Sequence, residues 1–235
     1  MRAKFIFLIV SFLLSFSLFA QDENEKSPCR FTKTTYYNGN GSMNFYVIRQ
    51  YTDKKQEVGM TYHNPDGSLR FYYKDDVNEE GKITKRTWYD AVNQMTSYTI
   101  HNYNEDGLEI SHYKYLPNGT VEHYRKFEYN AEKQLIKKEY NYEGELYDYT
   151  MYTYTEDGKI DKMKIYKPDN TYYRTLSYQY DEDEKRKYYD TYESDGTRSY
   201  RYTFYYDDKG KFYKEICLDK DGKIYTKNVY EYVCD

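Results

Sequence analysis

The chain has 235 residues, and 35 Lys and Arg against 39 Asp and Glu give it a formal net charge of −4. Its 36 tyrosines supply more apolar surface than a disordered protein carries, and its 3 cysteines are too few for a disulfide-framed small domain. No excess of basic residues is available to neutralise phosphates, so we expect no nucleic-acid partner.

Residues 1–20 are predicted to be a signal peptide. Arg2 and Lys4 precede an apolar run that ends at Phe19, and Ala20 is a small residue at the expected cleavage point. The apolar run is about 15 residues long, which is short for a bilayer core of about 30 Å, so cleavage is favoured over a membrane anchor. Loss of Arg2 and Lys4 leaves 33 basic against 39 acidic residues, a net charge of −6. We therefore expect an exported protein, secreted, periplasmic or at the cell surface, without stable membrane insertion.

The three cysteines lie near the two ends of the mature chain. Cys29 is close to the expected new N-terminus, whereas Cys217 and Cys234 are close to the C-terminus. Export permits disulfides, and a Cys29–Cys234 bond would tie the ends together. The sequence does not decide the pairing, and an odd count leaves at least one thiol unpaired within a monomer.

A repeated turn signal, Asn/Asp/Glu-x-x-Gly, organises the chain from Gly41 to Gly222. Successive turn positions are separated alternately by 14 and 12 residues, with a single spacing of 11, so a unit of about 26 residues occurs seven times. Where glycine is missing, the equivalent place is taken by another residue: Lys55, Asn93, Lys133, Asn170 and Glu184. We expect an N-terminal segment over 21–36 and one repeat domain over 37–235.

The stretches between turns predict strands. They hold 7 to 10 residues and are rich in Tyr, Phe, Ile, Val and Thr. A four-residue hairpin turn is closed by a residue with positive φ, which suits Gly, and it begins with a capping Asn or Asp. The prediction is an all-β fold without helices, an antiparallel meander of about 15 strands that forms either a coiled open sheet or a closed barrel.

Side-chain alternation predicts a drier and a wetter face. In the eight longer strands, apolar or tyrosine residues fill 27 of 40 even positions after the turn glycine, but only 13 of 40 odd positions. The drier face also carries charges: Arg49, Asp75, Arg125, Asp148, Arg174 and Arg198. An arginine facing lipid near mid-bilayer costs about 2–4 kcal/mol, which disfavours the alternative of an outer-membrane barrel. A tyrosine ends seven of these strands and is expected to pack there: Tyr51, Tyr103, Tyr129, Tyr154, Tyr180, Tyr206 and Tyr232.

Tyr-Asp pairs near the turns resemble a known repeat. Tyr89-Asp90, Tyr180-Asp181 and Tyr206-Asp207 are similar to the YD repeats of Rhs-type and teneurin-type proteins. The Tyr-x-x-x-Gly rhythm also resembles MORN-type repeats and related hairpin repeats of exported bacterial proteins. Rhs-type repeats form a shell around a toxin, and no toxin domain fits in this chain. The resemblance implies hairpin repeats and an interaction role, and it implies no catalytic residues.

Three histidines are predicted to gather on one face. If Tyr115 pairs with Thr120 across the turn, His112 lies opposite His123, and His101 lies diagonally on the next strand. Three imidazoles in one patch suit zinc or a pH sensor, and the alternative is a mixed polar and aromatic face. No metal motif reinforces the first reading, so the sequence predicts no cofactor.

A row of tyrosines on the wetter face is the best candidate for a binding surface. The fifth position of five successive longer strands is tyrosine: Tyr46, Tyr72, Tyr98, Tyr124 and Tyr149. Such a ladder suits a glycan or a protein partner, or it stabilises the sheet through cross-strand contacts. No nucleophile, serine elbow or phosphate loop is visible. The sequence thus predicts a non-catalytic binding or interaction module, with an outer-membrane barrel or a polysaccharide-active hydrolase as alternatives.

Overall fold

The computed structural model describes residues 31–51 and 56–233, and these form sixteen antiparallel strands and no helix. The predicted signal peptide, Cys29, Lys55 and Cys234 lie outside the described residues. The strands are β1 (Phe31–Asn38), β2 (Met43–Tyr51), β3 (Glu57–His63), β4 (Leu69–Val77), β5 (Ile83–Asp90), β6 (Met95–Tyr103), β7 (Glu109–Tyr115), β8 (Val121–Tyr129), β9 (Leu135–Tyr142), β10 (Glu145–Tyr154), β11 (Ile160–Tyr166), β12 (Tyr172–Tyr180), β13 (Arg186–Glu193), β14 (Arg198–Tyr206), β15 (Phe212–Asp219) and β16 (Ile224–Val233).

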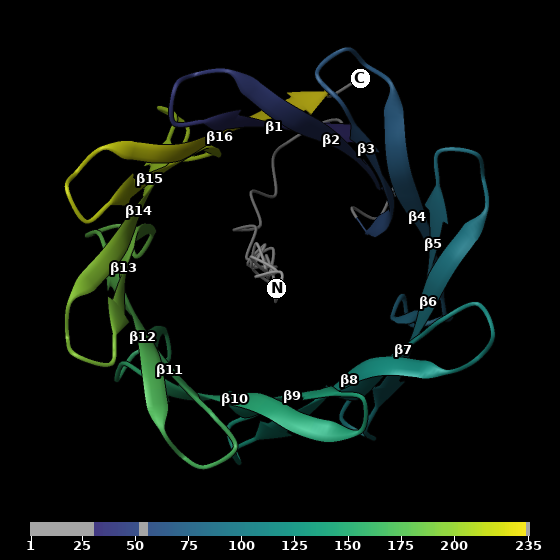
Figure 1. Ribbon diagram of the computed structural model, residues 1–235. Helices are drawn as coiled ribbons and strands as arrows, with labels where there is room; N and C mark the ends of the chain where they lie inside the picture. Colours follow the sequence, from purple (N-terminus) through teal and green to yellow (C-terminus); the bar gives the residue numbers. More distant parts are fainter. Residues whose placement is uncertain (1–30, 52–55, 234–235) are drawn as a thin grey trace, which may run out of the picture.

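The sheet closes into a barrel. Each strand pairs with its neighbours in the sequence, and β1 also pairs with β16, with Phe31 opposite Val233 (Figure 1). The closed barrel is therefore the correct one of the two predicted forms. The meander has sixteen strands rather than about 15, because β1 begins at Phe31, inside the segment 21–36 that was predicted to precede the repeat domain.

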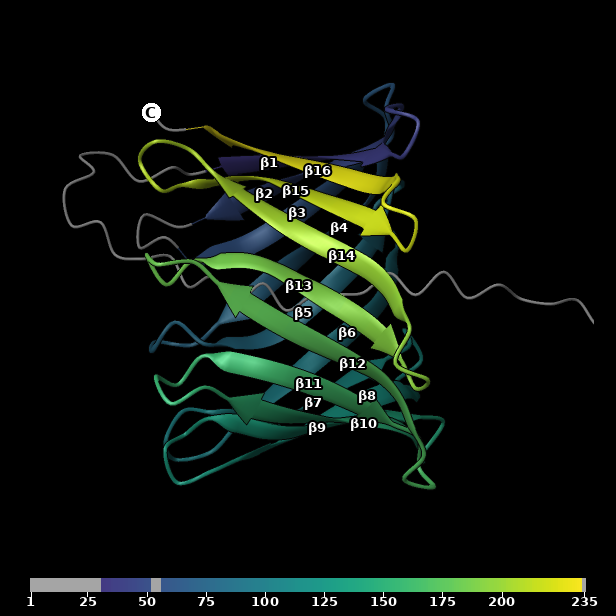
Figure 2. The same ribbon diagram turned by 90° about the vertical axis from the view of Figure 1, so that its left-hand side faces the viewer.

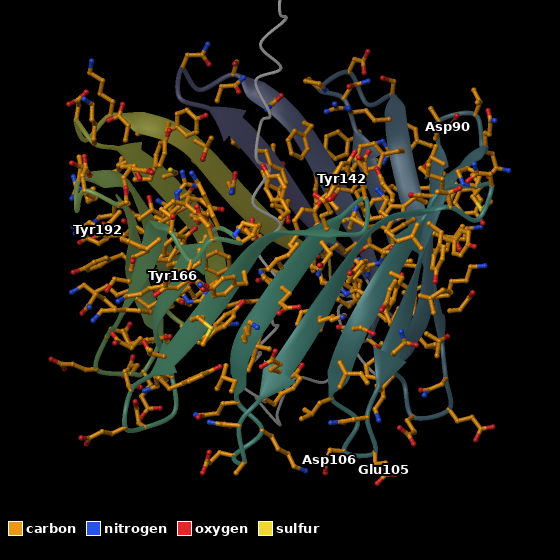
Figure 3. The ribbon with its side chains drawn as sticks, turned by 60° about the horizontal axis from the view of Figure 1, so that its bottom comes forward. Asp90, Glu105, Asp106, Tyr142, Tyr166 and Tyr192 are labelled. Carbon is orange, nitrogen blue, oxygen red and sulfur yellow. The ribbon has the colours of Figure 1, made fainter. Side chains whose placement is uncertain are left out.

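The barrel has two ends, which we name by the chain termini. The terminal rim carries the start of β1, the end of β16 and the turns that follow even-numbered strands; the far rim carries the other turns (Figure 2). Figure 3 shows Glu105 and Asp106 at a tip of the terminal rim and Asp90 at the opposite end.

Turn chemistry follows the prediction closely. Positive φ occurs at ten glycines and, as predicted, at Asn93, Lys133, Asn170 and Glu184. Asn104 Oδ1 accepts a hydrogen bond from the Leu108 backbone N–H at 2.8 Å. Several far-rim turns use their third residue instead, as where Asp66 Oδ1 accepts the Ser68 N–H at 2.9 Å. Side-chain and backbone hydrogen bonds from Ser68 lower the pKa of Asp66.

One turn differs from the prediction. The segment Asn141–Gly144 was expected to form a four-residue turn, but the turn between β9 and β10 has only the two residues Glu143 and Gly144, with φ of 50° and 86°. Two successive positive φ values are typical of a type I′ hairpin. Asn141 is consequently a buried strand residue and caps no turn. This shorter turn accounts for the single 11-residue spacing.

The drier face lines the inside of the barrel. Val47 is fully buried, and Tyr73 and Tyr189 on the same face are each 2% exposed, whereas Lys74 and Lys126 on the opposite face are exposed. Side chains converge on the concave side of a closed sheet, which identifies the buried face as the inner one. The barrel thus places its apolar contacts, and several charges, on its inner wall.

The tyrosines that end the longer strands make a repeated hydrogen bond. The Tyr103 hydroxyl donates to the Ile83 carbonyl at 2.8 Å, across to the start of the preceding strand. Burial raises the pKa of Tyr103 to about 12. The same contact recurs five times around the terminal rim: Tyr129 to Glu109, Tyr154 to Leu135, Tyr180 to Ile160, Tyr206 to Arg186 and Tyr232 to Phe212. The expected packing at strand ends is therefore a specific tie between neighbouring strands.

Two turn substitutions test the requirement for positive φ. Gly119 has a φ of 83° and open space where a Cβ would lie. Gly119→Ala therefore introduces no steric clash, and its only cost is to hold an alanine at positive φ. We expect it to reduce the free energy of unfolding by about 1–2 kcal/mol in urea titrations. Glu184→Gly should act in the opposite direction, because Glu184 already has a φ of 65°. An equal loss of stability in both variants would contradict this account.

Candidate functional site

A row of aromatic rings crosses the inner wall from β1 to β5, and we call it the aromatic strip: Tyr36, Phe45, Tyr62, Phe71 and Trp88. Ring centroids are 4.3 Å apart for Tyr36 and Phe45, 4.1 Å for Tyr62 and Phe71, and 6.0 Å for Phe71 and Trp88. Each strand contributes one ring from its far-rim half. All five side chains stay partly exposed, so the strip faces the interior of the barrel.

The strip rests on the buried core of this wall. Val47, Met60 and Tyr73 form the core cluster, and four of the five strip residues pack against it. Tyr73 meets Trp88 edge to face with centroids 4.8 Å apart. Aromatic pairs in such geometries contribute about 0.5–1.5 kcal/mol beyond the area that they bury, which holds the strip in place.

A layer of paired charges lies beside the strip, toward the terminal rim. Arg86 donates two hydrogen bonds of 2.7 Å to Asp75, and its guanidinium lies 3.7 Å from the Tyr73 ring centroid. Burial opposes the charge of Arg86, but the hydrogen bonds that Arg86 donates to Asp75 keep the pKa of Arg86 above its ordinary value. Arg49 lies 3.7 Å from Glu57, which also accepts a hydrogen bond from the Tyr73 hydroxyl. We call Arg49, Glu57, Asp75 and Arg86 the charged layer.

The predicted histidine arrangement is wrong in two respects, because His101 is directly opposite His112 rather than diagonal to it, and His123 is not opposite His112. His112 lies opposite His101, and the residue opposite His123 is Lys114. The strand register shifts beside the turn, so that Tyr115 pairs with Val121 and not with Thr120. His123 therefore stays on the inner face, but it is not the cross-strand partner of His112.

Glu109 takes the place predicted for His123. Its Oε1 atom lies 2.7 Å from His101 Nδ1 and 2.8 Å from His112 Nδ1. Burial alone would raise the pKa of Glu109, but hydrogen bonds from the two imidazoles hold it at about 2. Burial also lowers the pKa of His112. We call His101, Glu109 and His112 the histidine cluster. The alternation rule missed Glu109 because the residue lies at a register shift beside Tyr103.

The predicted outer ladder is largely engaged in contacts within the sheet. Its rings stack at 4.8–5.1 Å on cross-strand rings, in the pairs Tyr46–His63, Tyr72–Tyr89, Tyr98–Tyr115, Tyr124–Tyr113 and Tyr149–Tyr166. A lysine ammonium lies 5.0–5.7 Å from each ladder ring: Lys33, Lys74, Lys85, Lys126 and Lys137. For Tyr46, Tyr98 and Tyr149 this lysine comes from the strand on the other side, so the ring lies between an aromatic partner and a cation. These contacts favour the sheet-stabilising interpretation of the ladder.

The inner wall also contains a buried acid on β15, two strands from β1 in the closed barrel. Glu215 on β15 is 6% exposed and lies opposite Phe204 and Asn228. Desolvation raises the pKa of Glu215 to about 7, with Arg186 opposing the shift. Cys217, two residues along, is a buried free thiol whose pKa burial raises to about 11.

Glu215 makes stability depend on pH. A carboxyl that titrates at about 7 when folded and about 4.3 when unfolded binds its proton more tightly in the native state, so stability is lost as pH rises between these values. Glu215→Gln should therefore resemble wild type at pH 4 and exceed it by about 3 kcal/mol at pH 8 in urea unfolding. The exposed outer-face variant Glu231→Gln is the control. A Glu215→Gln gain that is equal at both pH values would contradict the assignment.

Comparisons with known proteins support the barrel fold, and they identify no family for this chain. No protein-family model matches the chain, and no curated protein matches it. A porin-like protein from Bacteroides uniformis has a similar structure, with a TM-score of 0.59 and 10% identity over 89% of this chain and 98% of that one. A porin-like protein from Bacteroides vulgatus, with 11% identity over 88% of this chain and 98% of that one, has a TM-score of only 0.30, too low to support an argument. The resemblance to YD and MORN-type repeats stays a prediction. Within the part of the chain that the structure describes, there is no helix that qualifies as a candidate membrane span.

Proposed function

We propose that this protein is an exported, non-catalytic barrel that binds a glycan on its inner wall. The aromatic strip beside the charged layer is the observation that carries the proposal. Sugar rings have apolar faces that stack on aromatic rings and hydroxyl edges that bond to charged side chains, and binding sites combine such surfaces in concave places. Eight strands make a barrel that its own side chains fill, whereas sixteen enclose a channel. The strand number therefore supports an interior with room for a ligand.

The strip is a better binding surface than the outer ladder. Rings of both sets stack on cross-strand rings, but each ladder ring also has a lysine beside it, whereas four of the five strip rings are backed by the core cluster and lie on the concave inner wall. Five strands at about 4.8 Å spacing give the strip a width of about 19 Å. That width suits a chain of sugars better than a single one.

The carboxylates beside the strip support binding rather than hydrolysis. Asp75 is paired with Arg86, and Glu57 with Arg49. Glycoside hydrolysis needs one carboxylic acid that donates a proton and a second carboxylate that acts as base or nucleophile. Here each carboxylate is paired with an arginine, which favours its ionised form and holds it in place. This arrangement suits hydrogen bonding to a ligand better than proton donation.

The outer wall supports a barrel surrounded by water. Lys74, Lys126 and Lys164 lie near the middle of their strands, and their exposed side chains are on the outer face of the barrel. Each lysine would cost about 2–4 kcal/mol at the midplane of a bilayer. We therefore expect the mature protein to be monodisperse in buffer without detergent, as measured by size-exclusion chromatography with light scattering. A preparation that stays dispersed only in detergent would instead favour the outer-membrane alternative.

The single tryptophan gives a direct test of glycan binding. Trp88 is the only Trp of the chain and belongs to the strip, so a glycan on the inner wall should change its fluorescence. Glycans found by array screening would be titrated against wild type and Tyr62→Ala. We expect Tyr62→Ala to weaken binding about tenfold or more, since one stacked ring contributes about 1.4 kcal/mol.

The outer ladder supplies the matched control. The double variant Tyr72→Ala with Tyr98→Ala should leave glycan affinity unchanged. Loss of binding in that variant with full binding in Tyr62→Ala would move the site to the outer face. If no glycan binds and a protein partner is captured instead, the ligand of the inner wall would be a protein and the glycan proposal would be wrong.

A further inference from the structure

We propose that His101, Glu109 and His112 form a zinc-binding site on the inner wall near the terminal rim. The three side chains come from two neighbouring strands, β6 and β7, and their ligand atoms lie within 4.8 Å of one another. His101 and His112 are directly opposite in the register of β6 and β7. Glu109 lies at the start of β7, just after the turn between these strands, and pairs with Tyr103 two residues beyond His101. This site is separate from the aromatic strip on β1 to β5 and does not depend on glycan binding.

The distances suit a small cation. Both Nδ1 atoms already point at the same carboxylate oxygen, at 2.7 and 2.8 Å. Zinc bonds of about 2.0–2.1 Å in tetrahedral geometry place neighbouring ligand atoms about 3.3 Å apart. Small side-chain rotations that widen each N–O separation by about 0.5 Å would thus admit the ion.

The donor set selects the metal class. Two imidazole nitrogens and one carboxylate oxygen are a ligand set found in zinc sites that keep a fourth position open, whereas calcium and magnesium prefer oxygen ligands alone. The side chains of His101, Glu109 and His112 keep 15%, 24% and 11% exposure, so an ion and a water molecule can reach them. The open position would face the interior of the barrel.

Surrounding contacts hold two of the three ligands in place. The Tyr129 hydroxyl donates to the Glu109 carbonyl at 2.8 Å, and Phe127 meets the His112 ring edge to face at 5.4 Å. These contacts fix the backbone at Glu109 and the orientation of the His112 ring.

Arg125 opposes metal binding at this site. Its Nη1 atom lies 3.4 Å from His112 Nε2, on the side of the ring away from Glu109. A metal on Nδ1 leaves the proton of a neutral imidazole on Nε2, so the Arg125 guanidinium must then turn away. Its charge also repels a cation. Removal of this charge should therefore strengthen zinc binding.

Isothermal titration of Zn²⁺ into the metal-free mature protein tests the proposal, with zinc content measured after dialysis. We expect one zinc per chain in wild type, at least tenfold weaker binding in Glu109→Gln and in His112→Asn, and tighter binding in Arg125→Gln. His123→Asn, an inner-wall histidine outside the cluster, is the matched control and should bind as wild type does. Circular dichroism confirms that each variant is folded.

A second measurement remains informative if His112→Asn fails to fold. Zinc should raise the thermal unfolding midpoint of wild type and His123→Asn, but not that of Glu109→Gln, because only a ligand bound to the native state stabilises it. No zinc binding by wild type would overturn the proposal. Equal weakening by His123→Asn and Glu109→Gln would overturn it too, because it would indicate diffuse binding to the wall.

Discussion

The pairing of β1 with β16 is the constraint on which the rest of the structure depends. Eight residue pairs, from Phe31 opposite Val233 to Asn38 opposite Thr226, join the first strand to the last. Without this seam, both strands would expose unpaired backbone groups as sheet edges. With it, every strand has two neighbours, and one face of the sheet becomes an enclosed inner wall. The aromatic strip and the histidine cluster are inner-wall features because the sheet closes.

Closure also explains why the drier face carries charge. An inner wall of sixteen strands is too wide for side chains to meet across it, so the wall is only partly shielded from water. Charges persist there when they are paired, as Arg86 is with Asp75. The cost of burying a charge falls when a partner and further hydrogen bonds are supplied, and Tyr73 and Glu57 extend this network. A wall that combines apolar residues with paired charges explains why apolar or tyrosine residues favour the even strand positions over the odd ones only two to one.

The prediction of turns was more accurate than the prediction of cross-strand contacts. Positive φ at Asn93, Lys133, Asn170 and Glu184 was predicted from spacing alone, because a hairpin turn is decided by a few adjacent residues. The His112–His123 pairing was wrong because a register shift of one residue at Tyr115 changes every partner beyond it. Glu109 was missed for the same reason, and the outer tyrosines were found but their stacking partners were not.

The local sequence determines the strand spacing, the turn positions and the alternation of faces, because each of these depends on residues within a single hairpin. Closure of the sheet, the choice of which face becomes concave, and the meeting of Glu109 with two histidines belong to the assembled barrel. They depend on twist and register accumulated over sixteen strands, and no single repeat contains that information.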